Sequence, residues 1–185
     1  MQPVPKANSR RKPSHQVIYY TLMSSPFGPI GIASTPRGIC RISLNANNEP
    51  AFRKKLERDY RCSAVRQDRH FAELGAGMRT YFSGSPVRFG GKIDLLEGTP
   101  FQKKVWRFLQ RIPFGQTRSY QTVARAIGHP NSFRAVGGAC GNNPIAVLIP
   151  CHRVINADGK LGGYTGGLQI KRRLLSIERT DRFRG

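Results

Sequence analysis

Short runs rich in Val, Ile and Tyr alternate with turn residues in the first part of the chain, between Val17 and Leu44. Pro-Phe-Gly-Pro and Thr-Pro-Arg-Gly interrupt these runs, a pattern typical of tight turns between neighbouring strands. Apolar residues then recur at helical spacing over Glu49–Tyr60 and Arg69–Phe82, and a further strand is predicted at Val87–Leu95. The pattern therefore predicts a small α+β unit that begins with an antiparallel sheet.

The pattern of the second half is mainly helical. Thr99 is a good helix cap and Pro100 suits a first helical position, so an amphipathic helix is predicted from there to about Ile112. Two shorter helices, at Ser119–Ile127 and Asn131–Cys140, flank a Gly-His-Pro turn, which is typical of helix-turn-helix DNA-binding domains. A packed helix pair that does not contact DNA has the same pattern.

The second of these helices contains two adjacent glycines, Gly137 and Gly138. Each costs a helix about 1 kcal/mol relative to alanine. A close approach of the backbone, either to a neighbouring helix or to a DNA groove, would compensate for that cost.

Two more elements follow in the C-terminal half. The apolar run Ile145–Ile149 predicts a buried strand that ends at Pro150. Beyond a glycine-rich loop, a final helix carries a stripe of Ile170, Leu174 and Ile177.

The first residues have a composition of their own. Residues 1–15 hold four Lys and Arg, three Pro and no acidic residue, a composition that does not fold alone. We predict a flexible basic arm at 1–15, an N-terminal α+β domain at 16–97 and a C-terminal domain at 98–185.

The charge of the chain predicts a polyanionic partner. Lys and Arg number 31 against 10 Asp and Glu, a formal net charge of +21, and residues 98–185 hold 15 of the basic residues but only 3 of the acidic ones. Nucleic acid is the first candidate, and a generally basic surface is the alternative. No apolar run is long enough for a membrane span and the start has no secretory signal pattern, so we expect a cytoplasmic protein with no membrane partner.

One of the four cysteines is a candidate nucleophile. The cysteines follow no zinc-ligand spacing, so neither a metal nor a cofactor is predicted. Cys151 follows the apolar run directly and precedes His152 and Arg153, where we expect the pKa of the thiol to be lowered toward the reactive thiolate. A small buried core residue is the other interpretation of this cysteine.

The sequence places a carboxylate, Glu178, at the edge of the apolar stripe of the final helix. Glu178 follows Leu174 by four residues, and a buried acid needs a partner. The neighbouring arginines and His152 are candidates, and a surface pair with Arg172 or Arg173 is the alternative.

The sequence resembles the O6-alkylguanine-DNA alkyltransferases, a family also called methylated-DNA--protein-cysteine methyltransferases. Its segment Ile-Pro-Cys-His-Arg-Val at 149–154 is similar to the alkyl-acceptor motif of that family. Further matching segments, in chain order, are Thr-Pro-Phe-Gln at 99–102, Val-Trp at 105–106, Ile-Pro-Phe-Gly at 112–115, Ser-Tyr at 119–120, Arg-Ala-Val-Gly at 134–137, Asn-Pro at 143–144 and Gly-Tyr-Thr-Gly-Gly at 163–167. The resemblance implies an N-terminal domain with ribonuclease H-like topology and a helix-turn-helix C-terminal domain that binds DNA and accepts the alkyl group.

The resemblance also implies roles for particular residues. Cys151 would accept the alkyl group, His152 would act as its base through a water, Glu178 would orient the histidine and Asn143 would brace the turn.

Other residues would contact DNA or the damaged base. Arg134 would fill the stack, beside Ala135, Gly137 and Gly138 against the minor groove, and Tyr120 would help to flip the base and donate to guanine N3. Tyr164 and Thr165 would line the guanine pocket, with Thr165 near O6.

The implied activity is DNA repair by direct reversal. One protein monomer would take one methyl or alkyl group from O6-alkylguanine, and also from O4-alkylthymine, in double-stranded DNA. Two other classes fit parts of the sequence. A protein that only binds alkyl lesions would not need the cysteine, and a cysteine hydrolase would not need the basic, glycine-rich helix.

Overall fold

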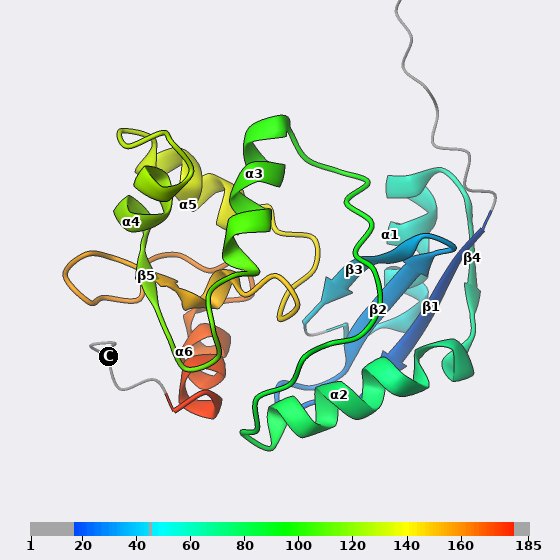
Figure 1. The fold of residues 1–185 in the computed structure, drawn as a ribbon. Coiled ribbons are helices and arrows are strands. Elements are labelled where there is room, and N and C mark those ends of the chain that lie inside the picture. The colour runs from blue at the N-terminus through cyan, green and yellow to red at the C-terminus, as the bar shows by residue number, and fades with distance from the viewer. Residues whose placement is uncertain (1–16, 45, 180–185) are drawn as a thin grey trace, which may run out of the picture.

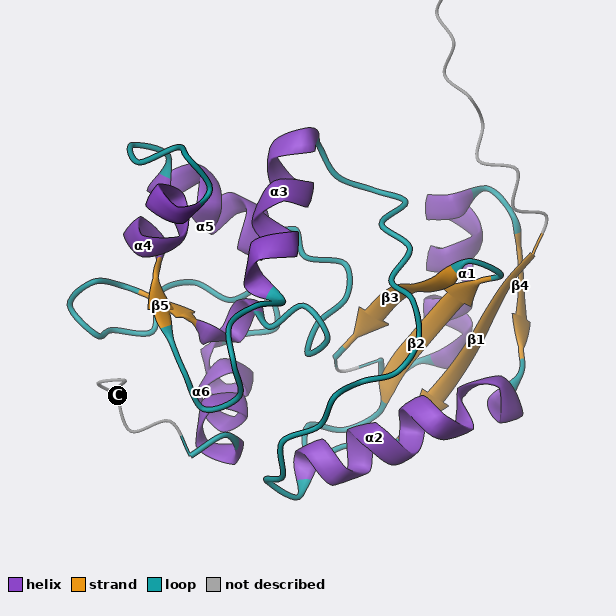
Figure 2. Ribbon diagram, viewed as in Figure 1, coloured by secondary structure: helices purple, strands orange, loops and turns teal. Residues whose placement is uncertain are grey.

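A computed structural model describes residues 17–44 and 46–179 of the chain, and the predicted basic arm lies outside them. A unit built on a β-sheet lies beside a mainly helical unit (Figures 1 and 2). This architecture confirms the predicted α+β class. Within the described ranges, no helix is both long and apolar enough to cross a lipid bilayer.

The N-terminal unit is built on a four-stranded sheet with the order β3-β2-β1-β4. The strands β1 (Val17–Met23), β2 (Ile30–Thr35) and β3 (Gly38–Ser43) are antiparallel neighbours, as the sequence pattern predicts. The hydrophobic pattern does not reveal β4 (Ser63–Arg66), a short strand that pairs in parallel with β1.

Helices cover both faces of this sheet. The helix α1 (Glu49–Tyr60) is capped by Asn48, whose side chain accepts a hydrogen bond from the N–H of Ala51, and it packs on one face. A 3-10 turn, η1 (Asp68–Phe71), and the helix α2 (Ala72–Phe82) cover the other face.

The strand predicted at Val87–Leu95 is wrong. This segment is a loop whose only bridge within the described part of the chain joins Ile93 to Ile39. Gly90 and Gly91 interrupt it, and Gly91 has a φ of +90°, which is incompatible with a continuous strand.

The C-terminal unit contains four helices: α3 (Pro100–Leu109), α4 (Tyr120–Ala126), α5 (Phe133–Gly141) and α6 (Leu168–Ile177). Thr99 caps α3 in a capping box with Gln102, which confirms the predicted start of this helix. The helices α4 and α5 pack together as the predicted helix-turn-helix pair. Two short parallel strands, β5 (Arg118–Ser119) and β6 (Val154–Ile155), link α4 to the segment after Cys151.

The strand predicted at Ile145–Ile149 is also wrong. The run is buried for the most part, but it folds back on itself: the N–H of Ile149 donates to the carbonyl of Ile145, and Val147 has a φ of +72°. An apolar run shows burial whatever its backbone conformation, so the pattern does not distinguish this tight turn from a strand.

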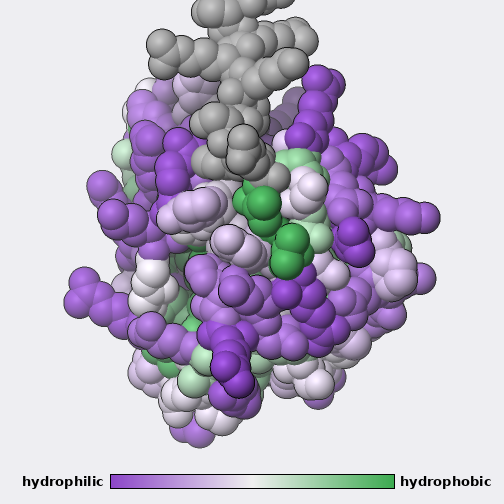
Figure 3. All heavy atoms as spheres, turned by 90° about the vertical axis from the view of Figure 1, so that its right-hand side faces the viewer, coloured by the Kyte–Doolittle hydropathy of each residue, from purple (hydrophilic) through white to green (hydrophobic). Residues whose placement is uncertain are grey.

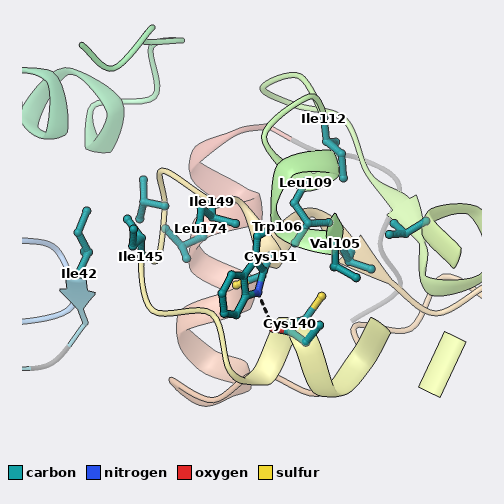
Figure 4. Close-up of a cluster of buried hydrophobic side chains, with 14 of the residues drawn as sticks. Ile42, Val105, Trp106, Leu109, Ile112, Cys140, Ile145, Ile149, Cys151 and Leu174 are labelled. Atoms are coloured by element: carbon teal, nitrogen blue, oxygen red, sulfur yellow. Dashed lines mark hydrogen bonds between the residues drawn. The ribbon is translucent and has the colours of Figure 1, made fainter. Parts of the chain in front are cut away.

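One hydrophobic core extends through both units. The N–H of Ile42 in β3 donates to the carbonyl of Pro144 at 2.9 Å, and both units contribute buried side chains to the same cluster. Trp106 lies at its centre and donates from Nε1 to the carbonyl of Ala139 at 2.8 Å (Figure 4). This shared core holds the sheet unit against the loop that leads to Cys151.

Candidate active site

Cys151 is the first residue of a 3-10 turn, η2 (Cys151–Arg153), which follows Pro150. Its side chain is buried, with 5% of the residue exposed. The tight turn before it ends with the N–H of Cys151 donating to the carbonyl of Ile149. Figure 4 shows Cys151 among the core side chains around Trp106.

Asn143 fixes the position of the thiol. Its Nδ2 donates to Cys151 Sγ at 3.1 Å and to the carbonyl of Ile149 at 2.7 Å. Its Oδ1 accepts from the N–H of Ile145 at 3.0 Å. One amide thus ties both ends of the turn to the sulfur.

The expected lowering of the thiol pKa is wrong. Burial raises the pKa of Cys151, and the hydrogen bond from Asn143 and the nearby charge of Lys171 oppose this rise only in part. Arg153 does not supply a compensating charge, because its guanidinium is bonded to Glu178. A thiol in this environment needs a base to take its proton as it reacts.

His152 and Glu178 form a buried pair next to the thiol. His152 is fully buried, and its Nε2 lies 2.7 Å from Glu178 Oε1. Arg153 binds the same carboxylate through Nε and Nη2 at 2.9 Å each, and the N–H of Gly115 donates to Oε2 at 3.0 Å. Glu178 is therefore paired with both His152 and an arginine.

The alternative partners for Glu178, Arg172 and Arg173, do not bind it. Burial alone would raise the pKa of Glu178, but the bonds from His152 and Arg153 outweigh burial and lower the pKa to about 2. The carboxylate is ionised at neutral pH and can only accept hydrogen bonds.

This pairing fixes the chemistry of the histidine ring. Because the carboxylate only accepts, Nε2 of His152 carries the proton, and Nδ1 keeps a free lone pair. Nδ1 is buried and has no hydrogen-bond partner among the described residues. Burial also lowers the pKa of His152, so the ring is neutral at pH 7 and Nδ1 can accept a proton.

A cavity of about 440 Å³ opens beside the thiol. Cys151, Asn143 and Tyr164 line it from the C-terminal unit, and Arg41 and Glu97 line it from the N-terminal part of the chain. The hydroxyl of Tyr164 is buried without a hydrogen-bond partner in the described part of the chain. A buried unpaired hydroxyl at a cavity is available to bind a ligand.

The chain matches two models of one family. The model described as the ribonuclease-like domain of 6-O-methylguanine DNA methyltransferase matches residues 18–95, and the model described as the DNA binding domain of the same protein matches residues 100–180. A methylated-DNA--protein-cysteine methyltransferase of Methanosarcina barkeri is 41% identical over 164 residues, which are 89% of this chain and 99% of the relative. One from Mycolicibacterium paratuberculosis is also 41% identical, over 88% of this chain and 93% of the relative. The chain belongs to the methylated-DNA--protein-cysteine methyltransferase family.

Solved structures agree with this membership. The Mycobacterium tuberculosis O6-methylguanine methyltransferase is 38% identical with a TM-score of 0.74, covering 91% of this chain and 96% of that one. The M. tuberculosis OGT in complex with DNA is 38% identical with a TM-score of 0.75, covering 89% and 94%. The ribonuclease-like description of residues 18–95 confirms the predicted topology of the first domain.

In this methyltransferase, three of the five residues expected to contact DNA line a second hollow of about 530 Å³. Tyr120, Arg134 and Gly137 line it together with the pocket residue Tyr164. A Cβ atom added at Gly138 would meet nothing within 4 Å, and one added at Gly137 would meet only the Tyr120 ring at 3.8 Å. The two glycines therefore leave this part of α5 open and do not pack it tightly against another helix.

Of the two remaining predicted residues, Thr165 lines both cavities, whereas Ala135 lines neither. Thr165 is exposed, and its Oγ1 donates to the carbonyl of Gly141 at 2.5 Å, which joins the pocket loop to the end of α5. Ala135 is exposed on α5, next to Arg134. In the described part of the chain, no three His, Cys, Asp or Glu side chains gather as metal ligands would.

Two site residues escape sequence analysis. Tyr81, from α2 of the N-terminal unit, donates to Glu178 Oε1 at 2.7 Å and lies 3.2 Å from His152 Nε2. Lys171 is fully buried, and its Nζ donates to the carbonyls of Val154, Leu161 and Gly163 behind the pocket loop. Its burial lowers its pKa to about 8.

Proposed function

We propose that this methyltransferase repairs DNA by taking the alkyl group of O6-alkylguanine onto Cys151. The observation that carries the proposal is the buried thiol, held by Asn143 beside a histidine whose Nε2 is anchored on an ionised carboxylate. The relatives named methylated-DNA--protein-cysteine methyltransferases support the substrate class.

The proposed step is a displacement at the alkyl carbon. Cys151 gives up its proton to Nδ1 of His152 through a water, and the sulfur attacks the carbon bound to O6. The S–C bond forms as the C–O6 bond breaks, and the electron pair of that bond leaves with guanine. Glu178 stays ionised and stabilises the imidazolium that forms.

Hydrogen-bond donors would stabilise the departing base. Negative charge develops on guanine as the C–O6 bond breaks, and donors already aimed at that charge lower the barrier. We assign Tyr120 as a donor to guanine N3 and place Thr165 near O6, where its hydroxyl donates once it has released the carbonyl of Gly141. The unpaired hydroxyl of Tyr164 is available in the same pocket.

The base must leave the duplex to reach the thiol, because O6 of a stacked guanine is out of reach of a buried sulfur. We propose that the C-terminal domain (98–185) binds the minor groove as a monomer, with Arg134 filling the gap that the flipped base leaves. The open surface at Ala135, Gly137 and Gly138 would let α5 approach the DNA closely.

The product would be a thioether, which has no carbonyl for water to attack. Each protein molecule therefore reacts once. A cysteine hydrolase would instead turn over repeatedly.

Intact-mass spectrometry tests the proposal. Wild-type protein, Cys151→Ala and Cys140→Ala are each incubated with an excess of duplex that holds one O6-methylguanine. We expect wild type and Cys140→Ala to gain the mass of one methyl group and no more, and Cys151→Ala to gain none. Methyl uptake by Cys151→Ala, or tight binding of the duplex by wild type with no gain in mass, would overturn the proposal.

A further inference from the structure

Phe133 is an aromatic residue whose side chain lies outside the hydrophobic core. It is the first residue of α5 and 39% exposed, whereas the buried side of this helix is formed by Val136, Ala139 and Cys140. Among the described residues, the other large hydrophobic side chains with comparable exposure are Val65 and Leu168, which lie on other elements. A single exposed hydrophobic side chain is ordinary and needs no partner, so it is the position of Phe133, beside a hollow and Arg134, that points to one.

The position of Phe133 connects it to the site. It lines the same 530 Å³ hollow as Tyr120, Gly137 and Tyr164. The guanidinium carbon of Arg134 lies 5.8 Å from the centre of the Phe133 ring. A flat aromatic ring and a flat cation therefore stand together at the end of the helix that faces this hollow.

These two side chains have complementary properties toward stacked bases. An arginine can replace the hydrogen bonds and the volume of a flipped nucleotide, but it does little to separate a base step. Apolar side chains such as phenylalanine do separate steps when they enter the minor groove, since the unstacked bases then contact an apolar surface. An aromatic ring also stacks on any base, whatever the sequence.

We propose that Phe133 is a second DNA-distorting residue, which enters the minor groove beside Arg134 and unstacks the base step next to the lesion. The inference rests on the proposed function and adds to it a residue that lowers the cost of flipping. Phe133 would act on the stacked duplex and have no part in the bond-making step at Cys151.

A binding experiment tests whether Phe133 acts as a wedge, that is, a side chain that enters the minor groove and unstacks a base step. The experiment involves no methyl transfer. Phe133→Ala, Phe133→Trp and Val65→Ala are each made in a Cys151→Ala protein and titrated with duplex that holds O6-methylguanine next to 2-aminopurine, whose fluorescence rises when it unstacks. Val65 is the matched control because it is a hydrophobic residue of similar exposure on another element, β4. The side of the molecule at which Figure 1 places β4 faces the viewer in Figure 3 and is largely hydrophilic.

We expect Phe133→Ala to weaken duplex binding roughly five- to a hundredfold, the range for losing one base stack, and to lose most of the fluorescence rise. Phe133→Trp should keep both, and Val65→Ala should match its parent. An unchanged fluorescence rise in Phe133→Ala would overturn the wedge, even if the affinity fell.

Rates of methyl transfer, measured in proteins that keep Cys151, distinguish an effect of Phe133 on base unstacking from an effect on the transfer step. Phe133→Ala should slow methyl transfer from the duplex by a similar factor and slow transfer from the same lesion in a single-stranded oligonucleotide by a smaller factor, because no duplex step has to be unstacked there. Equal slowing on both substrates would show that Phe133 supports the fold of the pocket and is not a wedge. If wild type transfers no methyl group, the proposed function fails, and the fluorescence experiment still decides the role of Phe133.

Discussion

The two nitrogens of His152 meet opposite environments. On the Nε2 side, Glu178 accepts bonds from the histidine, Tyr81, Arg153 and the backbone of Gly115. On the Nδ1 side, the buried nitrogen has no partner among the described residues. The protein thus satisfies the groups that hold the ring and leaves unsatisfied the nitrogen that the proposed mechanism uses as the base.

The same contrast extends to the cavity. The hydroxyl of Tyr164 is buried and unpaired beside Cys151, whereas the amine of Lys171 behind the pocket loop is fully bonded to carbonyl groups. A buried polar group without a partner costs free energy unless a ligand supplies one. We call Glu178 with its donors, together with Lys171, the supporting side of the site, and expect it to stabilise the fold. The pocket side, His152 Nδ1 and the hydroxyl of Tyr164, should instead contribute to ligand binding.

Of the changes on the supporting side, Glu178→Gln should lower the free energy of unfolding the most. The variant leaves the half-buried guanidinium of Arg153 without its buried counter-charge, so we expect a loss of about 3 kcal/mol in the free energy of unfolding. Urea denaturation at pH 7 measures it. Glu57→Gln is the matched control, because the pair of Glu57 with Arg53 lies at the surface, where water and salt screen it, so its loss should change the stability far less. If both variants lost a similar amount of stability, the buried carboxylate would contribute no more than the surface carboxylate.

The same carboxylate predicts a pH dependence. Its folded pKa of about 2 lies below the ordinary value of 4.5, so its contribution is complete above pH 4.5 and is lost as the pH falls toward 2. Wild type should therefore lose about 3 kcal/mol more than Glu178→Gln over that interval. Urea midpoints at several pH values measure the difference, and a constant gap between the two proteins would be evidence against an ionised Glu178.

Lys171→Met should come next in size. The change leaves the carbonyls of Val154, Leu161 and Gly163 buried without their donor, at a net cost of about 2 kcal/mol or more. Thermal or urea unfolding measures the loss. Lys160→Met, at an exposed lysine, should stay within about 0.5 kcal/mol of wild type. Wild-type stability in Lys171→Met would show that the carbonyls need no internal donor.

Tyr81→Phe should have the smallest effect on stability of the changes on the supporting side. It removes one of several donors to Glu178, so we expect a loss of about 1–2 kcal/mol in the free energy of unfolding. Tyr19→Phe, on β1, is the control for losing a tyrosine hydroxyl in the same unit. If Tyr81→Phe unfolded at the same urea concentration as that control, the N-terminal unit would contribute packing alone to the site.

Residues close together in the sequence were the predictable part of the site. Cys151 and His152 are neighbours, and Glu178 belongs to an amphipathic helix, so motif and periodicity identify them. Tyr81 is 97 positions from Glu178, and nothing in local spacing indicates that α2 reaches the carboxylate. Lys171 precedes Leu174 by three residues and Glu178 by seven, so helical spacing places it on the buried stripe. The spacing does not reveal the backbone carbonyls that its amine binds, because the loop at Leu161 and Gly163 supplies two of them.

The fold shows the same limit. Helix starts depend on local caps such as Thr99, and these are predictable from the sequence. The short strand β4 exists because β1 offers it an edge, and the turn at Val147 exists because the surrounding core holds it. Both depend on distant segments.

Fragmentation mass spectrometry of the reacted protein shows which cysteine accepts the methyl group. The tryptic peptide from Ala135 to Arg153 contains both Cys140 and Cys151, so fragment ions that separate the two cysteines must locate the methyl group. After reaction with duplex that carries deuterated O6-methylguanine, we predict the label entirely on fragments that contain Cys151. Label on Cys140, or no label in this peptide, would contradict the account.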